Sequence, residues 1–145
     1  MTPETLPETL PETLIAAARD AAKNAYAPYS KFHVGAAILL TDGHVVTGAN
    51  FENASYGLSL CAETVAMAKI ANDGLLSDVA EIAVIGGTGV EPVRPCGRCR
   101  QVLNEAAQIG NRDIIVHCSS GDGSTIERHL LSALLPHAFG PKDLK

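Results

Sequence analysis

The sequence has no tryptophan, and only three Phe and three Tyr among its 145 residues. Charge is also scarce: 19% of the residues are charged, and the formal net charge is -5 at pH 7. A protein that binds nucleic acid needs a basic groove and aromatic side chains on which bases can stack. This composition therefore argues against a polynucleotide ligand and favours a small or neutral one.

Long apolar runs and targeting signals are lacking as well. The longest apolar stretch, around Val34 to Leu40, is far too short to cross a bilayer. The first residues contain neither the basic region nor the apolar region of a signal peptide. We therefore expect a cytoplasmic protein with no membrane partner. The length favours a single domain.

Proline interrupts the beginning of the chain, where Pro-Glu-Thr-Leu occurs three times between residues 3 and 14. A proline at every fourth position excludes a regular helix, because each one removes an N–H donor and clashes with the preceding turn. We predict a disordered leader over residues 1–11 and one domain over 12–145. Pro11 is suited to the first turn of a helix that runs to about Tyr26.

The pattern of apolar residues after this helix alternates between strand and helix periodicity. It predicts strands at 33–40, 45–47, 80–85 and 113–118, and helices at 60–72, 97–109 and 129–135. Apolar strands that alternate with helices imply a sheet covered on both faces. We therefore expect an α/β protein, a three-layer α/β/α sandwich with a mixed sheet.

Cysteine is present at four positions, too few for a disulfide scaffold. Cys61 opens one predicted helix, and Cys96 and Cys99 open the next. Helix N-termini stabilise thiolates, and adjacent parallel strands would bring both helix starts to one sheet edge. Three thiolates suit tetrahedral zinc and leave a fourth position open, which is typical of a catalytic site.

Glu63 follows Cys61 by two residues. A carboxylate beside a metal-bound water can accept its proton and deliver it elsewhere. Residues two apart do not share a helix face. The arrangement therefore requires Cys61 to lie at the very start of its helix.

Other interpretations of the cysteines stay open at this point. Cys96 and Cys99 could form a redox pair, and Cys118 could complete a closed structural zinc site. A cysteine at the end of an apolar strand is, however, more often a small core residue. A non-catalytic interaction module stabilised by zinc is a rival function from a different class. The five histidines show no ligand spacing.

Cys-Ala-Glu at 61–63, followed by Pro-Cys-Gly-Arg-Cys-Arg-Gln at 95–101, strongly resembles the zinc-dependent cytidine deaminases, in the three-cysteine form that acts on free nucleosides. Segments 28–37, 50–57 and 139–141 extend the resemblance in the family's order and spacing, so it covers everything except the leader. It implies the cytidine deaminase-like fold, with a mixed, mostly five-stranded sheet.

The resemblance implies hydrolytic deamination of cytidine and deoxycytidine to uridine and deoxyuridine in pyrimidine salvage, with release of ammonia. One zinc ion per chain is expected on Cys61, Cys96 and Cys99. Zinc-bound hydroxide would attack C4 of cytosine. Glu63, the expected catalytic residue, would carry a proton from the bound water to N3 and then to the departing amine.

Substrate contacts are implied in the same way. Asn50 and Glu52 match residues that bind the ribose, and alternate positions of an extended segment place both side chains on one face. Phe32 matches a ring that packs against the base. The backbone around Ala62 would bind the cytosine edge. Without the resemblance, Asn50 could equally be a turn residue, and the sequence alone would favour Phe32 as an ordinary core residue.

Three further residues belong to the implied substrate-binding set: Ala54, Tyr56 and Phe139. Tyr56 and Phe139 match residues that family members contribute to the site of a neighbouring subunit. The resemblance therefore implies a homotetramer with shared sites.

Thr64 departs from the pattern of many relatives, which have Arg directly after the catalytic Glu. Three thiolates on one zinc ion leave a net negative charge. Arg98, which lies between two ligands, is the candidate to offset it.

The enzyme rivals are a deaminase of another aminated ring, such as a blasticidin-type antibiotic, and a polynucleotide-editing enzyme. The ribose motif opposes the first, and the acidic composition opposes the second.

Overall fold

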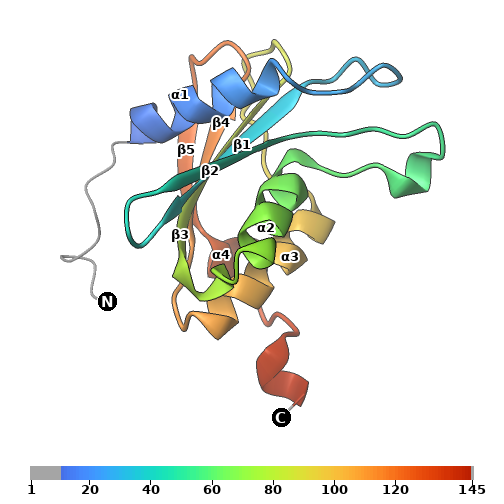
Figure 1. Cartoon of the computed structure of the whole chain (residues 1–145). Coiled ribbons are helices and arrows are strands. Elements are labelled where there is room, and N and C mark those ends of the chain that lie inside the picture. The colour runs from blue at the N-terminus through green and yellow to red at the C-terminus, as the bar shows by residue number, and fades with distance from the viewer. Residues whose placement is uncertain (1–10, 145) are drawn as a thin grey trace.

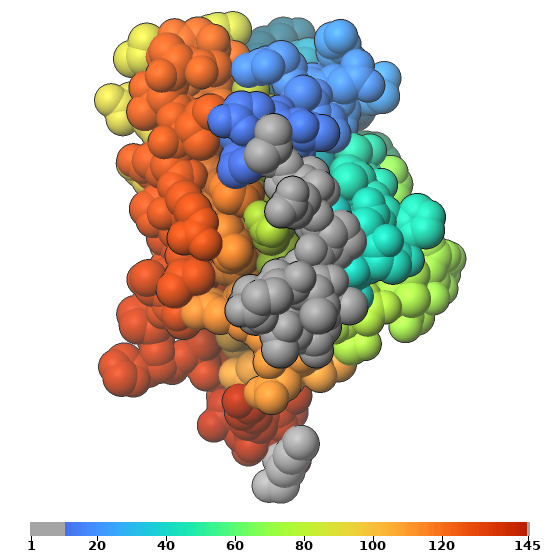
Figure 2. Space-filling view, turned by 90° about the vertical axis from the view of Figure 1, so that its left-hand side faces the viewer, coloured from blue at the N-terminus to red at the C-terminus, as the bar shows by residue number. Residues whose placement is uncertain are grey.

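The computed structural model describes residues 11–144. Residues 1–10 of the expected leader lie outside this part, and Pro11 is the first residue of α1 (Pro11–Ala22). The expected α/β/α sandwich is confirmed: a five-stranded sheet has α1 on one face and α2 (Ala62–Asn72) and α3 (Gly97–Ile109) on the other (Figure 1). In Figure 2, α1 (blue) lies between the β4–β5 side (orange) and the β1–β2 hairpin (teal).

The sheet consists of five strands in the order β2-β1-β3-β4-β5. Only β3 and β4 form a parallel pair; the other neighbours are antiparallel. The strand bounds are β1 (Val34–Leu40), β2 (Val45–Ala49), β3 (Val79–Gly86), β4 (Ile115–Ser120) and β5 (Ile126–Leu130).

The route from strands to helices differs in one respect from the expectation. α2 follows β2 and α3 follows β3, and these two strands are parallel in direction but not adjacent. β1 lies between them, antiparallel to both. The helix starts still meet, because β2 and β3 run in the same direction and therefore end at the same edge of the sheet.

The last predicted helix, 129–135, is wrong at its first two residues and at its last one. Residues Ile126–Leu130 form β5, and the helix α4 covers only Leu131–Leu134. As an edge strand, β5 pairs only with β4. Its side chains alternate between exposed and half-buried, so it carries little of the apolar pattern that identifies a strand.

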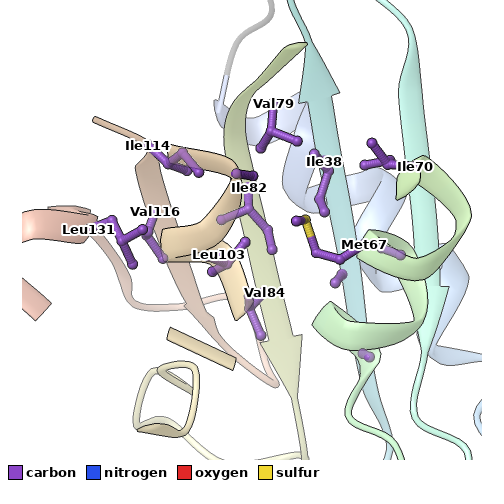
Figure 3. Packing of buried hydrophobic residues seen from close by; sticks show 14 of the residues in the cluster. Ile38, Met67, Ile70, Val79, Ile82, Val84, Leu103, Ile114, Val116 and Leu131 are labelled. Carbon is purple, nitrogen blue, oxygen red and sulfur yellow. The ribbon is translucent and has the colours of Figure 1, made fainter. Parts of the chain in front are cut away.

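The core is divided by the alternation of side chains along the strands. Ile38 and Ile82 are opposite each other in β1 and β3 and face α2 and α3, where Met67 and Leu103 pack on them (Figure 3). Residues one position away in these strands, such as Leu39, face α1 and its Leu14, Ile15 and Ala18.

Two glycines let the helices approach the sheet closely. A Cβ atom at Gly35 would lie 1.9 Å from the carbonyl oxygen of Ala18 in α1. A Cβ atom at Gly48 would lie 2.4 Å from the carbonyl oxygen of Ala62, the first residue of α2. Each glycine therefore fixes how near one helix lies to the sheet.

The first helix ends earlier than the sequence predicts, at Ala22 rather than near Tyr26. Tyr26 instead donates its N–H to Asn50 O at 2.9 Å and accepts from the N–H of Glu52 at 2.9 Å. These bonds align the segment after α1 with the segment after β2. Among the helices described, none is long and apolar enough to cross a membrane.

Candidate metal and substrate site

Three cysteine side chains meet where α2 and α3 begin. Cys61 and Cys96 are the residues that precede the two helices, and Cys99 lies in the first turn of α3. Their sulfur atoms all lie within 4.8 Å of one another, with 3.9 Å between those of Cys61 and Cys96. Tetrahedral zinc, with Zn–S bonds of about 2.3 Å, places two sulfurs about 3.8 Å apart. The three cysteines therefore fit one zinc ion.

The thiol of Cys61 is made more acidic by its neighbours. Its pKa is lowered to about 6, chiefly because the thiol of Cys99 hydrogen-bonds its sulfur, and then because that of Cys96 does. The charge of the exposed Arg98 guanidinium contributes to the same lowering. The pKa of Cys99 is raised by the same partnership with Cys61. Cys61 is thus held toward the thiolate form that a metal requires.

Glu63 is the second residue of α2 and is only 4% exposed. Burial, the larger cause, and the negative charge of Cys61 together raise its pKa to about 7. A carboxyl group in this range can both accept and donate a proton near neutral pH. It meets the chemical requirement for the proton carrier predicted from the sequence.

Thr64 contacts the cluster from the side of α2. Its Oγ1 lies 3.5 Å from the sulfur of Cys99, across the boundary between the two helices. A hydroxyl can donate to a thiolate and spread its negative charge. At the position where Arg is expected, the chain therefore still contacts a sulfur atom, with a neutral donor.

A cavity of about 320 Å³ opens beside the sulfur cluster. One wall contains Cys61, Cys96 and Glu63. Further lining residues come from the segment before β1 and the segment after β2. Four of the predicted substrate-binding residues line the cavity: Phe32, Asn50, Glu52 and Ala62.

Asn50 and Glu52 both hold the segment before β1. Asn50 accepts from the N–H of Val34 at 2.9 Å through Oδ1 and donates to Phe32 O at 2.8 Å through Nδ2. Glu52 accepts from the N–H groups of Tyr29 and Ser30, both at 3.1 Å. The predicted ribose contacts are thus built into the wall by their own hydrogen bonds.

The other predicted substrate-binding residues, Ala54, Tyr56 and Phe139, do not line this cavity. Ala54 and Tyr56 lie in a projecting arm, residues 52–59 (Figure 1), whose base is closed by backbone hydrogen bonds between Phe51 and Leu60. Tyr56 is 74% exposed. Phe139 is also exposed, and its carbonyl accepts from Gln101 at 2.8 Å.

Two arginines that the sequence did not single out hold the loop before Cys96. Arg94 makes two hydrogen bonds, of 2.9 and 2.7 Å, to Glu127 of β5. Arg100 donates to Pro95 O at 2.7 Å and to Leu134 O at 2.9 Å. Their partners lie up to 34 positions away, and no local pattern reveals such contacts.

Cys118 is fully buried in the core beneath α3, and burial raises its pKa to about 11. Over residues 11–144, the one group of side chains that could hold a metal consists of Cys61, Cys96 and Cys99. The arrangement does not support a closed site with four cysteines.

Comparison with known proteins gives a consistent result. The sequence profile described as "Cytidine and deoxycytidylate deaminase zinc-binding region" matches residues 8–118. A cytidine deaminase from Halalkalibacterium halodurans is 47% identical over 124 residues, which cover 86% of this chain and 89% of that protein. A cytidine deaminase from Mycobacterium tuberculosis is 45% identical over 127 residues, which cover 88% of this chain and 87% of that protein.

Solved structures of cytidine deaminases have the same fold. The crystal structure of a cytidine deaminase from Burkholderia pseudomallei superposes with a TM-score of 0.82 at 41% identity, over 90% of this chain and all of that one. The profile, the sequence relatives and the fold agree with the three-cysteine cluster. The chain therefore belongs to the cytidine and deoxycytidylate deaminase zinc-binding family.

Proposed function

We propose that this protein is a zinc-dependent hydrolase that converts cytidine and deoxycytidine to uridine and deoxyuridine, with release of ammonia. The observation that carries the proposal is a buried carboxyl group, Glu63, that lines the same cavity as Cys61 and Cys96, two members of the three-cysteine cluster. The similar proteins reported above are named cytidine deaminases.

The metal would be held by Cys61, Cys96 and Cys99. Zinc, when bound, supplies Lewis-acid chemistry that lowers the pKa of a water molecule to about 7. Glu63 accepts a proton from the attacking water and delivers it to N3 of the cytosine ring, which makes C4 electrophilic. Glu63 then carries the second proton to the amine at C4, which leaves as ammonia. Cytidine and water thus give uridine and ammonia.

Recognition of the substrate falls to other residues of the cavity lining. The second N–H of the Asn50 amide and the carboxylate of Glu52 would bind ribose hydroxyls. Phe32 would pack against the base, and the backbone at Ala62 would bind the polar edge of cytosine. These groups all line the cavity that Glu63 lines.

The loss of cytidine absorbance in the ultraviolet tests this proposal. The zinc-loaded protein should convert cytidine, and protein stripped by a chelator should not until zinc is restored. A protein that binds one zinc ion per chain but leaves cytidine unchanged would be a non-catalytic zinc module. Blasticidin and single-stranded DNA, offered as substrates in the same assay, test the two rival enzyme functions.

We also propose a homotetramer whose sites are shared between subunits. All six aromatic residues of the chain have exposed side chains, between 45% and 74%: Tyr26, Tyr29, Phe32, Phe51, Tyr56 and Phe139. Four of them lie in pairs, Tyr26 with Phe51 and Tyr29 with Tyr56, and neighbouring exposed apolar groups are typical of an interaction site. The projecting arm, with Tyr56, would reach a neighbouring subunit, as would Phe139.

Mixing two inactive variants tests the shared site. Glu63→Gln chains lack the proton carrier. Chains truncated before Phe139 lack this residue, which we propose as a lid over the site of the neighbouring subunit. A hybrid assembly can pair an intact centre with an intact lid, so the mixture should recover some activity. An active monomer in sedimentation, or an unchanged KM after truncation, would contradict the shared site.

We further propose that the enzyme acts in the cytoplasm in pyrimidine salvage. Four free cysteines agree with a reducing compartment. The gene should restore growth on cytidine to a pyrimidine auxotroph that lacks cytidine deaminase, and activity should stay with the cytoplasmic fraction. Removing residues 1–10 should leave activity unchanged if the catalytic domain begins near residue 12.

A further inference from the structure

Residues 29–33 form one wall of the cavity without regular secondary structure. Side chains from the segment after β2 hold much of this loop in place. Lys31 has φ of 60°, the left-handed region that a residue with a side chain seldom adopts. The shape of the wall therefore depends on the hydrogen bonds that hold the loop in this conformation.

Ser30 lies at the centre of these bonds. Its hydroxyl donates to Oε2 of Glu52, and its own Oγ accepts from the N–H of Phe32 at 3.0 Å. The N–H of Ser30 donates to Oε1 of Glu52 at 3.1 Å. One small side chain thus connects the carboxylate with the backbone of the aromatic residue.

The carboxylate of Glu52 is almost saturated by the loop. A carboxylate offers about four lone-pair positions, and the donors on Tyr29 and Ser30 occupy three of them. Oε2 keeps a position for a hydroxyl donor from a ligand. The pKa of Glu52 is held below its ordinary value, chiefly by the hydrogen bond from the Ser30 hydroxyl. The Glu52 carboxylate therefore stays a hydrogen-bond acceptor.

The ring of Phe32 is confined from the other side by glycine. A Cβ atom at Gly87, which has φ of +69°, would lie 2.7 Å from this ring. The ring therefore packs directly on the backbone after β3, while its N–H is fixed by Ser30. Both parts of the wall, carboxylate and ring, depend on one hydroxyl.

We propose that Ser30 is a positioning residue that couples recognition of the sugar by Glu52 to recognition of the base by Phe32. This inference rests on the proposed function, because it takes the cavity to be the nucleoside site. It predicts that the Ser30 hydroxyl sets the preference for nucleosides with sugar hydroxyls over nucleosides without them.

The test compares cytidine with 2′,3′-dideoxycytidine. Ser30→Ala should lower kcat/KM for cytidine about tenfold, mainly through KM, because a hydrogen bond to a charged group is lost. The loss for dideoxycytidine should be smaller, since that substrate lacks the hydroxyls that Glu52 would bind. The ratio of the two kcat/KM values should therefore fall. Ser30→Thr, which keeps the hydroxyl, should restore the ratio.

Two controls separate this effect from a general disturbance. Ser124→Ala removes a comparable hydroxyl-to-carboxylate bond, to Asp122 at 2.7 Å in the β4–β5 turn, and should leave the ratio unchanged. On a Glu52→Gln background, Ser30→Ala should change the ratio no further, because two residues that act through one contact are not additive.

The inference is wrong if Ser30→Ala keeps the wild-type ratio, if Ser30→Thr fails to restore it, or if Ser30→Ala still changes the ratio in the Glu52→Gln protein. The proposed function fails separately, when the zinc-loaded wild-type protein leaves cytidine unchanged. Zinc content and melting temperature of each variant show whether it is loaded and folded.

Discussion

The two faces of the sheet are covered by the same kind of contact but differ in what their helices carry. On one face, α1 packs through small and branched residues, and none of its residues lines the cavity beside the sulfur cluster. On the other face, α2 and α3 both begin at that cavity, and their first turns hold Glu63 and Cys99. Burial alone therefore does not distinguish the faces.

The difference lies in where each helix begins. The first turn of a helix presents unpaired N–H groups and a partial positive charge. Two helices on the same face start at the same end of the sheet, so that the sulfur atoms of Cys61 and Cys96 lie 3.9 Å apart. The single helix on the opposite face has no such partner. The proposed reaction therefore takes place where the starts of two helices meet.

The strongest test of this comparison uses two cysteines on the same face of the sheet. Cys96→Ser should abolish zinc binding and activity, because it removes one of three ligands. Cys118→Ser should keep one zinc ion per chain and cost only about 1 kcal/mol of stability, as a small core change. Metal analysis of both purified variants decides. Loss of zinc from Cys118→Ser as complete as from Cys96→Ser would contradict the open three-ligand site.

Glu63→Gln separates chemistry from packing within α2. The amide has nearly the same size, so zinc and the fold should be retained. Turnover should fall at least about 100-fold, because proton transfer is lost. Single-turnover measurements on cytidine, with metal content and melting temperature as controls, provide the check. Activity within a few-fold of wild type would rule out Glu63 as the proton carrier.

The sequence predicts the parts of the fold that have strong local signals. The apolar run of β1 and the span of α3, Gly97–Ile109, are found as expected. β5 was missed because an edge strand with half-exposed side chains has little apolar pattern. The end of α1 was placed too late because Tyr26 pairs with the segment after β2, a contact that no local pattern contains.

The same division applies to the site. Cys61, Cys96 and Cys99 were predicted to meet because each stands near a predicted helix start, and the structure brings them together. The contact between Thr64 and Cys99, and the bonds of Ser30 to Glu52, join residues more than 20 positions apart. Such contacts depend on how the elements pack, so single residue types in the sequence do not reveal them.

Thr64 sharpens the comparison at the level of one hydrogen bond. Thr64→Val keeps the shape but removes the donor to the sulfur of Cys99. We expect zinc to leave about tenfold faster, since changes beside metal ligands commonly cost 10- to 100-fold in affinity. Transfer of zinc to a chromogenic chelator measures this rate without reference to activity. Thr64→Ser should release zinc at nearly the wild-type rate, and equal rates for both variants would contradict a role for the hydroxyl.

Gly35 and Gly48 offer the finest comparison of the two faces, because each fixes the distance of one helix from the sheet. Gly35→Ala would push on Ala18 in α1, and Gly48→Ala would push on Ala62 at the start of α2. Overpacking of this kind costs about 1–3 kcal/mol, so both variants should unfold at lower denaturant concentration. Only Gly48→Ala should also speed zinc release, by a few-fold, because Ala62 directly follows a ligand. Equal zinc release from both variants would mean that the helix start tolerates displacement, and that α2 places Cys61 less strictly than the packing indicates.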